Sequence, residues 1–384
     1  MSTENDINAL LKTFDEDAQE KRIEEHEGSF FRNAPENAVM IERAREFNDV
    51  TKHWVRRELW LKTVKKIRQE LSRPLRLLTL PGRHRFEIGL YEKEKLLART
   101  SVDGEERLDV VGFEYDPTQF GLMMTAEPRL RELLCGDVLK ALVDPKSENG
   151  SAIRACAPYD VINLDLTTNI ANRNDGPYPP FLKGVRECFQ LQGSHAGPWA
   201  MMVTFRAGTP ETDPSVLETL REFFQQNLEK HLKVKEHCID RYRVSTAKEV
   251  LERHPEEGLA QVTAKWIIEQ GHSFEWECRK YRHAAYDRTF HEGRKRYSLR
   301  KLVFEFSKRP APNRQLPLRG VPEQSWHADD LAKLFEQAAL VDVDEVMKNM
   351  QADKRAFLEK EIAELSGEGT TTDSASTHPL GRAT

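Results

Sequence analysis

Tyr159-Asp-Val-Ile-Asn-Leu-Asp165 is one of four short apolar runs that decide the fold of this 384-residue chain. The other three are Leu75-Arg-Leu-Leu-Thr-Leu-Pro-Gly82, Asp109-Val-Val-Gly-Phe-Glu-Tyr-Asp116 and Trp199-Ala-Met-Met-Val-Thr-Phe205. Helix-like segments separate these runs, and strands that alternate with helices favour a parallel, doubly wound sheet. Such sheets bind ligands at the carboxyl ends of their strands, where this chain carries acidic and glycine residues. We therefore expect a nucleotide-like cofactor site at that edge of the sheet.

The composition of the chain favours a soluble, cytoplasmic protein. Apolar residues make up 39% of the chain and charged residues 32%, and the formal net charge is -5. No run of about 18 apolar residues predicts a membrane span, so we expect no membrane partner. The amino-terminal residues lack the basic-then-apolar pattern of a signal peptide. Five widely spaced cysteines without a CxxC pair fit reduced thiols better than disulfides or a zinc site, and we expect no metal.

Changes in periodicity and composition predict five segments. Each has its own character: a flexible acidic amino terminus, a helical layer docked on the sheet, the sheet domain, a carboxyl-terminal helical segment and a disordered tail. In that order, the segments are residues 1–35, 36–73, 74–310, 311–366 and 367–384.

Within the sheet domain, the spacing of apolar residues predicts a helix over residues 117–134 and a loop over residues 144–157. A second helix is expected over residues 181–191. The strand-like residues 274–284 and 298–307 predict an antiparallel pair at the edge of the sheet.

A basic block lies between Arg279 and Arg314, where twelve Lys or Arg residues outnumber three acids. It also carries aromatic residues, and cations interleaved with aromatics are typical of surfaces that meet phosphates and stack on bases. An alternative is a twisted surface hairpin whose aromatic side chains face the core, which the alternation over residues 302–306 favours. In the basic 279–309 region, the residues that we expect to contact nucleic acid are Arg279, Lys280, Arg282, Arg294, Lys295 and Arg296.

Taken in order, these runs resemble the class I S-adenosylmethionine-dependent methyltransferases over about residues 75–308. The resemblance implies an α/β fold: a doubly wound, mostly parallel seven-stranded sheet with an antiparallel edge pair, extended by helices at both termini. It also implies S-adenosylmethionine as the cofactor, lying across the ends of the first, second and fourth strands.

The resemblance assigns three residues to the cofactor. Gly82 follows the first strand, where a side chain would collide with the cofactor. Glu114 ends the second strand, where a carboxylate can accept both ribose hydroxyl protons, although it could instead cap the following helix. Asp137 stands where an acid contacts the adenine amino group, and it could equally be the N-cap of the helix over residues 138–142.

The resemblance also implies a catalytic position at the end of the fourth strand. Asp165 ends that strand, facing the place where substrate would meet the cofactor. Methylation of an amine needs a polar acceptor that orients the nucleophile, and Asp165 or Asn163 could supply it. The function implied is therefore methylation of a nucleic-acid base in RNA or DNA, with catalysis by proximity and orientation.

Two other functions stay open because Thr79, Pro81 and Arg83 replace the acid and the glycines of the family's first motif. One is a catalytically degenerate methyltransferase-like domain that serves as a structural subunit of a larger complex, such as a phage-defence complex. Its terminal helices would then dock a protein partner. The other is a Rossmann-like enzyme that binds a different nucleotide, with Arg83 and Arg85 on phosphate.

Overall fold

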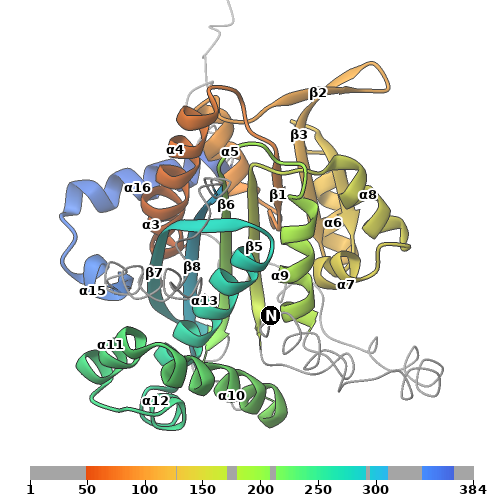
Figure 1. Cartoon of the computed structure of the whole chain (residues 1–384). Helices are drawn as coiled ribbons and strands as arrows, with labels where there is room; N and C mark the ends of the chain where they lie inside the picture. The colour runs from red at the N-terminus through yellow and green to blue at the C-terminus, as the bar shows by residue number, and fades with distance from the viewer. Residues whose placement is uncertain are drawn as a thin grey trace, which may run out of the picture.

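The computed structural model describes residues 49–126, 128–170, 180–207, 213–290, 295–309 and 340–366 (Figure 1). In these ranges, nine strands form one sheet in the order β2-β3-β1-β5-β6-β8-β7-β9, and β4 pairs with β3. The strands are β1 (Leu77–Thr79), β2 (Arg99–Val102), β3 (Glu105–Glu114), β4 (Leu130–Cys135), β5 (Val161–Asn169), β6 (Trp199–Ala207), β7 (Trp276–Phe290), β8 (Lys295–Lys308) and β9 (Leu340–Asp342).

The sheet is doubly wound and mostly parallel, as the sequence predicts. Strands β4, β3, β1, β5 and β6 are mutually parallel neighbours, whereas β8 is antiparallel to both β6 and β7. The predicted antiparallel pair is thus β7 and β8, a hairpin with 14 paired positions. Two strands extend the expected seven: β2 folds back on the start of β3, and β9 pairs with β7.

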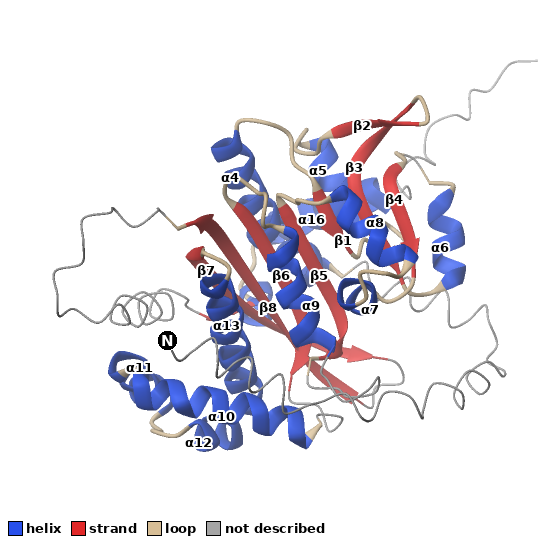
Figure 2. Cartoon of the chain, turned by 45° about the vertical axis from the view of Figure 1, so that its right-hand side comes forward, coloured by secondary structure: helices blue, strands red, loops and turns tan. Residues whose placement is uncertain are grey.

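Helices cover both faces of the sheet (Figure 2). One face packs chiefly on α7, α8, α9 and α13, and the other on α3, η2, α4, α5 and α15. The helices are α3 (Val50–Val55), the π-helical η2 (Arg56–Leu61), α4 (Lys62–Leu71), α5 (Phe86–Lys93), α6 (Pro117–Met124), α7 (Val138–Val143), α8 (Glu148–Cys156), α9 (Pro180–Leu191), α10 (Pro214–Lys230), α11 (Leu232–Tyr242), α12 (Ala247–Arg253), α13 (Pro255–Ser273), α15 (Val343–Lys348) and α16 (Ala352–Ser366).

Helices α10, α11 and α12 follow β6 and lie beyond the carboxyl ends of the parallel strands, at the bottom of Figure 1. They therefore sit at the edge of the sheet where doubly wound proteins bind ligands.

Two predicted elements are wrong. The helix expected over residues 117–134 ends at Met124, and β4 begins at Leu130. The loop expected over residues 144–157 contains α8, whose first turn is capped by the Ser147 side chain at the Gly150 N–H. A side chain at Gly150 would meet the Asp144 carbonyl oxygen at 1.9 Å, so this glycine marks close packing within a helical turn.

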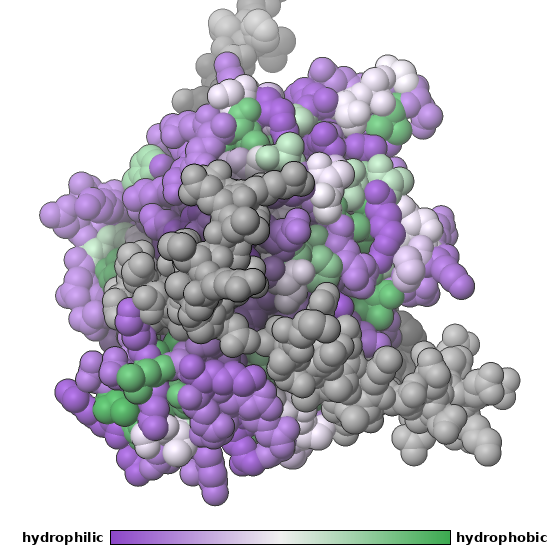
Figure 3. Space-filling view, viewed as in Figure 1, coloured by the Kyte–Doolittle hydropathy of each residue, from purple (hydrophilic) through white to green (hydrophobic). Residues whose placement is uncertain are grey.

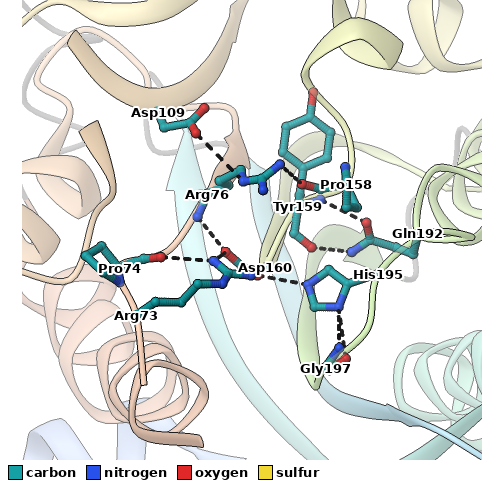
Figure 4. Close-up of polar contacts among 10 residues, drawn as sticks. All are labelled: Arg73, Pro74, Arg76, Asp109, Pro158, Tyr159, Asp160, Gln192, His195 and Gly197. Carbon is teal, nitrogen blue, oxygen red and sulfur yellow. Dashed lines mark hydrogen bonds and ion pairs between the residues drawn. The ribbon is translucent and has the colours of Figure 1, made fainter. Parts of the chain in front are cut away.

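At the amino ends of the parallel strands, buried Asp160 binds four donors (Figure 4). Arg73 donates two hydrogen bonds of 2.8 and 2.7 Å, and the Arg76 N–H donates a third of 2.8 Å. The His195 Nε2 lies 2.8 Å from Asp160, and its Nδ1 accepts from the Gly197 N–H at 3.1 Å. We call Arg73, Arg76, Asp160 and His195 the Asp160 network. It joins the end of α4 to the starts of β1, β5 and β6.

The face of the molecule seen in Figure 3 is mostly hydrophilic. Hydrophobic colour gathers at its lower left, where Figure 1 places α11. On that helix Leu232 is 69% exposed and Ile239 is 39% exposed. Within the described residues, every helix is too short or too polar to cross a lipid bilayer.

Candidate functional site

Strand register brings three of the predicted residues to one edge of the sheet. Thr79 of β1 pairs with Gly112 of β3 and with Asn163 of β5. Glu114 pairs with Cys135, the last residue of β4. The turn at Gly82, the Glu114 carboxylate and Asp137 therefore all lie where the parallel strands end. Gly82 has φ +60°, and a Cβ there would meet nothing within 4 Å, so this turn leaves room for a ligand.

Glu114 is a half-buried carboxylate with capacity for further hydrogen bonds. Its Oε1 accepts from the Asp116 N–H at 3.0 Å. Burial raises the pKa of this carboxyl, and the nearby Asp116 carboxylate adds to the rise. The next residue, Tyr115, is 76% exposed. The helix α6 is capped by Asp116, which accepts from the Thr118 N–H at 2.8 Å, and not by Glu114.

Asp137 is the N-cap of α7. Its Oδ1 accepts from the Leu139 N–H at 2.8 Å, and Gly136 before it has φ +136°. An ionised carboxylate has two oxygens, so capping leaves one oxygen for another donor. The cofactor role of Asp137 stays a prediction.

Arg85 cannot serve the phosphate-binding alternative that was open from the sequence. Its guanidinium is committed to the carbonyl oxygens of Met123, Ala126 and Pro128, after α6, with the last two at 3.2 and 2.8 Å. Arg83 is exposed and remains the one cation of that pair that could meet a ligand.

Asp165, the predicted catalytic residue, lies between two lysines from distant parts of the chain. Its Oδ2 is 2.7 Å from the Lys52 Nζ of α3, and its Oδ1 accepts from the Lys301 Nζ of β8 at 3.0 Å. Lys301 also donates to the Thr204 Oγ1 at 2.9 Å. Burial raises the pKa of the Asp165 carboxyl, but Lys301 and Lys52 outweigh burial and hold that pKa well below its usual range. Asp165 is therefore ionised at neutral pH.

Lys301 is an unusual residue for a central strand. It is 1% exposed, and its Nζ lies 4.1 Å from the centre of the Trp60 ring. Burial lowers the pKa of Lys301 to about 7, although the Asp165 carboxylate opposes this fall. Strongly shifted groups of this kind concentrate at functional sites, because burial and charge partners are arranged there to set protonation.

Asn163, the second predicted catalytic residue, belongs to the same polar region. Its Nδ2 donates to the Thr79 Oγ1 at 3.3 Å, and Thr79 donates in turn to the Glu87 Oε1 at 3.2 Å. The Asn163 Oδ1 is buried and has no hydrogen-bond partner among the described residues. Burial raises the pKa of Glu87, which is 2% exposed.

Four residues of this region were not expected from the sequence: Lys52, Arg56, Glu87 and Lys301. None of them carried a local signal: Lys301 shares a side of its strand with Glu305, opposite the apolar Leu302, so the alternation assigns it to the polar side. Together with Asn163 and Asp165, these four residues form a group that we call the Asp165 cluster. No group of three metal-binding side chains occurs in the described ranges, here or elsewhere.

Most cations of the basic block whose side chains the structure describes are engaged within the fold. Arg282 binds Glu305 at 3.1 Å, and Arg279 binds Glu70 at 2.8 Å. Lys280 is exposed. Arg294 and the side chains of Lys295 and Arg296 lie outside the described residues. The aromatic side chains of Tyr281, Tyr286, Phe304 and Phe306 are buried, as the hairpin alternative predicted.

The order and the directions of the strands define the class of fold. The strands β4-β3-β1-β5-β6-β8-β7, with β8 antiparallel, have the arrangement of the class I methyltransferase fold, so the resemblance seen in the sequence is confirmed at the level of fold. The chain belongs to the PP_RS20740-like family, whose sequence model matches residues 50–367. No curated protein matches the chain.

Several solved structures, among them those of two methyltransferases, are similar to the chain at low sequence identity. TYW2 of M. jannaschii, in complex with AdoMet, is 9% identical with a TM-score of 0.29, covering 65% of this chain and 75% of that one. The plantazolicin methyltransferase BpumL, in complex with SAH, is 9% identical with a TM-score of 0.34, covering 71% and 89%. The 1,6-didemethyltoxoflavin-N1-methyltransferase of Burkholderia thailandensis is 8% identical with a TM-score of 0.28, covering 73% and 93%.

Proposed function

We propose that this chain is an S-adenosylmethionine-dependent methyltransferase. The observation that carries the proposal is the half-buried Glu114 carboxylate at the end of β3, followed by the exposed Tyr115, at the edge of the sheet where β1 leads into the open turn at Gly82. A carboxylate so placed can accept both ribose hydroxyls, and an aromatic ring can stack on adenine. A turn without a side chain lets the backbone approach the ligand closely.

Bound S-adenosylmethionine would supply a methyl group attached to a positively charged sulfur. The residues of the chain would bind the cofactor and orient the substrate. Glu114 would hold the ribose, and the second oxygen of Asp137 would accept a hydrogen bond from the adenine amino group. Asp165 cannot take up a proton at neutral pH, because Lys52 and Lys301 hold it ionised. Its part is to orient an acceptor amine together with the unpartnered Asn163 Oδ1, so that catalysis rests on proximity.

Calorimetric titration with S-adenosylmethionine and S-adenosylhomocysteine tests the cofactor assignment. We expect Glu114→Ala to weaken binding by about 10- to 100-fold, since hydrogen bonds to a charged group contribute roughly 1.5–3 kcal/mol. The matched control is Glu106→Ala on the same strand, where the side chain is exposed and pairs with Arg99. Equal affinity in the wild type and Glu114→Ala would remove Glu114 from the site.

The acceptor that we propose is a base of RNA or DNA. This substrate is supported by Lys280, which projects from β7 with an exposed side chain, and by the cations at positions 294, 295 and 296 that follow β7 in the sequence. Each lost phosphate contact should lower the slope of log affinity against log salt by about one. Binding of a labelled RNA by Lys280→Gln, compared with Lys248→Gln on α12, measures this change. Identical salt dependence in the two variants would count against the hairpin as the binding surface.

A second function is favoured by one observation: Lys52 and Lys301 occupy both oxygens of Asp165. A domain that no longer transfers methyl groups could keep this ion pair purely to dock α3 on the sheet, and could serve as a structural subunit. Calorimetry separates the two functions. Absence of heat with either ligand, from protein that melts cooperatively, would favour the structural subunit.

A further inference from the structure

Three buried cations lie between the α3–η2 segment and the sheet, and the nearby acids do not balance them. Lys52 is 8% exposed, Arg56 3% and Lys301 1%. Within the described part of the chain, the acids whose charges act on this group are Asp165 and Glu87. Burial raises the pKa of Glu87, but even with both carboxyls ionised the three cations outnumber the two acids. Counted over the described residues, the Asp165 cluster therefore holds a net positive charge away from water, which is costly unless an anion accompanies it.

Arg56 is the cation with unused donors. Its Nε and Nη1 are buried and have no hydrogen-bond partner among the described residues. The guanidinium carbon lies 4.9 Å from the centre of the Phe86 ring, and this stacking leaves the in-plane N–H groups free for an acceptor. A buried donor without a partner costs about 1–3 kcal/mol, so its persistence needs an explanation.

The local backbone supports a binding role for this position. Arg56 begins η2, a wide helical turn that runs to Leu61 between α3 and α4. Such π-helical turns are rare and occur frequently at functional sites. Trp60, in the same turn, lies over the Lys301 ammonium, so one turn places both a guanidinium and an aromatic ring against the end of the sheet.

We propose that Lys52, Arg56 and Lys301 form an anion-binding subsite that takes a carboxylate or phosphate group of a ligand. Arg56 supplies the planar fork of N–H donors that matches such oxygens, and the two lysines supply the surrounding positive charge. The anion has two chemical sources: the carboxylate at the methionine end of S-adenosylmethionine, or an anionic group of the methyl acceptor. The first source rests on the proposed function, whereas the second does not.

Titrations of the full chain with three probes distinguish these sources. S-adenosylhomocysteine carries the carboxylate, methylthioadenosine lacks it, and inorganic phosphate represents an acceptor anion. The test variant is Arg56→Met, and the matched control is Arg68→Met, a half-exposed arginine on the adjoining helix α4. If the site takes the cofactor carboxylate, Arg56→Met weakens S-adenosylhomocysteine binding at least about tenfold and leaves methylthioadenosine binding unchanged. If it takes an acceptor anion, Arg56→Met abolishes the phosphate binding that the wild type shows by phosphorus NMR.

The remaining outcomes overturn the subsite. If both S-adenosylhomocysteine and phosphate bind Arg56→Met as they bind the wild type, or if neither binds the wild type, then Arg56 holds no anion. Phosphate binding that Arg56→Met abolishes, with no binding of S-adenosylhomocysteine by the wild type, would refute the proposed function and keep the subsite. Unaltered S-adenosylhomocysteine binding in Arg56→Met, with no phosphate binding by the wild type, would refute the subsite and keep the proposed function.

Thermal melting without ligand checks that the Arg56→Met variant is folded before these titrations are interpreted. Removing an uncompensated buried cation should leave the melting temperature of Arg56→Met equal to that of the wild type or higher. A large fall would mean that Arg56 is satisfied within the fold, which also contradicts the subsite.

Discussion

The amino ends and the carboxyl ends of the parallel strands, here called the amino edge and the carboxyl edge of the sheet, carry similar buried charged residues. They differ in how completely these residues are hydrogen-bonded. At the amino edge, Asp160 accepts from Arg73, Arg76 and His195, and the second nitrogen of His195 is bound as well (Figure 4). At the carboxyl edge, Asp165 is also buried between cations, but neighbouring polar atoms lack hydrogen-bond partners within the described part of the chain. These atoms belong to Arg56 and Asn163.

This difference separates a structural role from a functional one. Buried polar groups of folded proteins are almost always hydrogen-bonded, so a satisfied network such as that around Asp160 needs no ligand to explain it. Groups left without partners at the edge where doubly wound sheets bind ligands are better explained by a ligand. The comparison therefore predicts that substitutions at the amino edge change stability, whereas those at the carboxyl edge change binding as well.

Asp160→Asn should have the largest effect. Burial raises the pKa of the Asp160 carboxyl, but hydrogen bonds from His195 and Arg73 outweigh burial and leave that pKa lowered, so the native state depends on the charge. Losing one partner of such a buried pair costs about 3–5 kcal/mol of unfolding free energy. Urea unfolding measures the loss, with Asp240→Asn, exposed on α11, as the control. A cost below about 1 kcal/mol would mean that the Asp160 network is not an anchor.

Asp165→Asn should cost somewhat less, about 3 kcal/mol, because Lys52 loses its carboxylate but Lys301, with a pKa of about 7, can release its proton. Replacing the pair by apolar residues, as Asp165→Leu with Lys301→Met, should recover most of that loss. Urea unfolding of the single and double variants makes the comparison. A double variant less stable than Asp165→Asn would show that this ion pair is itself needed for folding.

Lys301→Met should alter how stability depends on pH. The pKa of Lys301 is about 7 in the folded chain, below the 10.5 of an exposed lysine. Between these values the unfolded chain binds more protons than the folded one, so this residue makes stability rise with pH. Between pH 7 and pH 8, the unfolding free energy of the wild type should rise by about 1 kcal/mol relative to that of Lys301→Met. Urea unfolding at each pH measures this change. Parallel plots of unfolding free energy against pH for the two proteins would exclude a lowered pKa for Lys301.

The smallest effects come from two buried amides. Gln192 pairs with both the N–H and the carbonyl of Tyr159 at the amino edge, so Gln192→Leu should cost about 1–3 kcal/mol. Asn163→Val removes an oxygen without a partner and one long hydrogen bond to Thr79, so its cost should stay below about 1 kcal/mol. Equal losses of unfolding free energy in the two variants would remove the distinction between the edges.

Much of the sheet could be predicted from the chain because its central strands contain continuous apolar runs. Leu77, Val110 and Ile162 belong to runs buried on both faces, and such runs are recognisable locally. Strand β4 was missed because most of it is only partly buried, so its polar residues imitate a helical pattern. Helix α8 was missed because its few buried residues, such as Ile153, give a weak periodicity.

The sequence by itself determined the order of strands and helices and the acidic and glycine residues at the strand ends, since these depend on neighbours within one element. Only the tertiary structure decided which charges are buried together. Lys52, Asp165 and Lys301 lie in three segments far apart in the chain, and sheet register and helix packing bring them within hydrogen-bonding distance. No local pattern encodes such an encounter, because it depends on how distant elements pack.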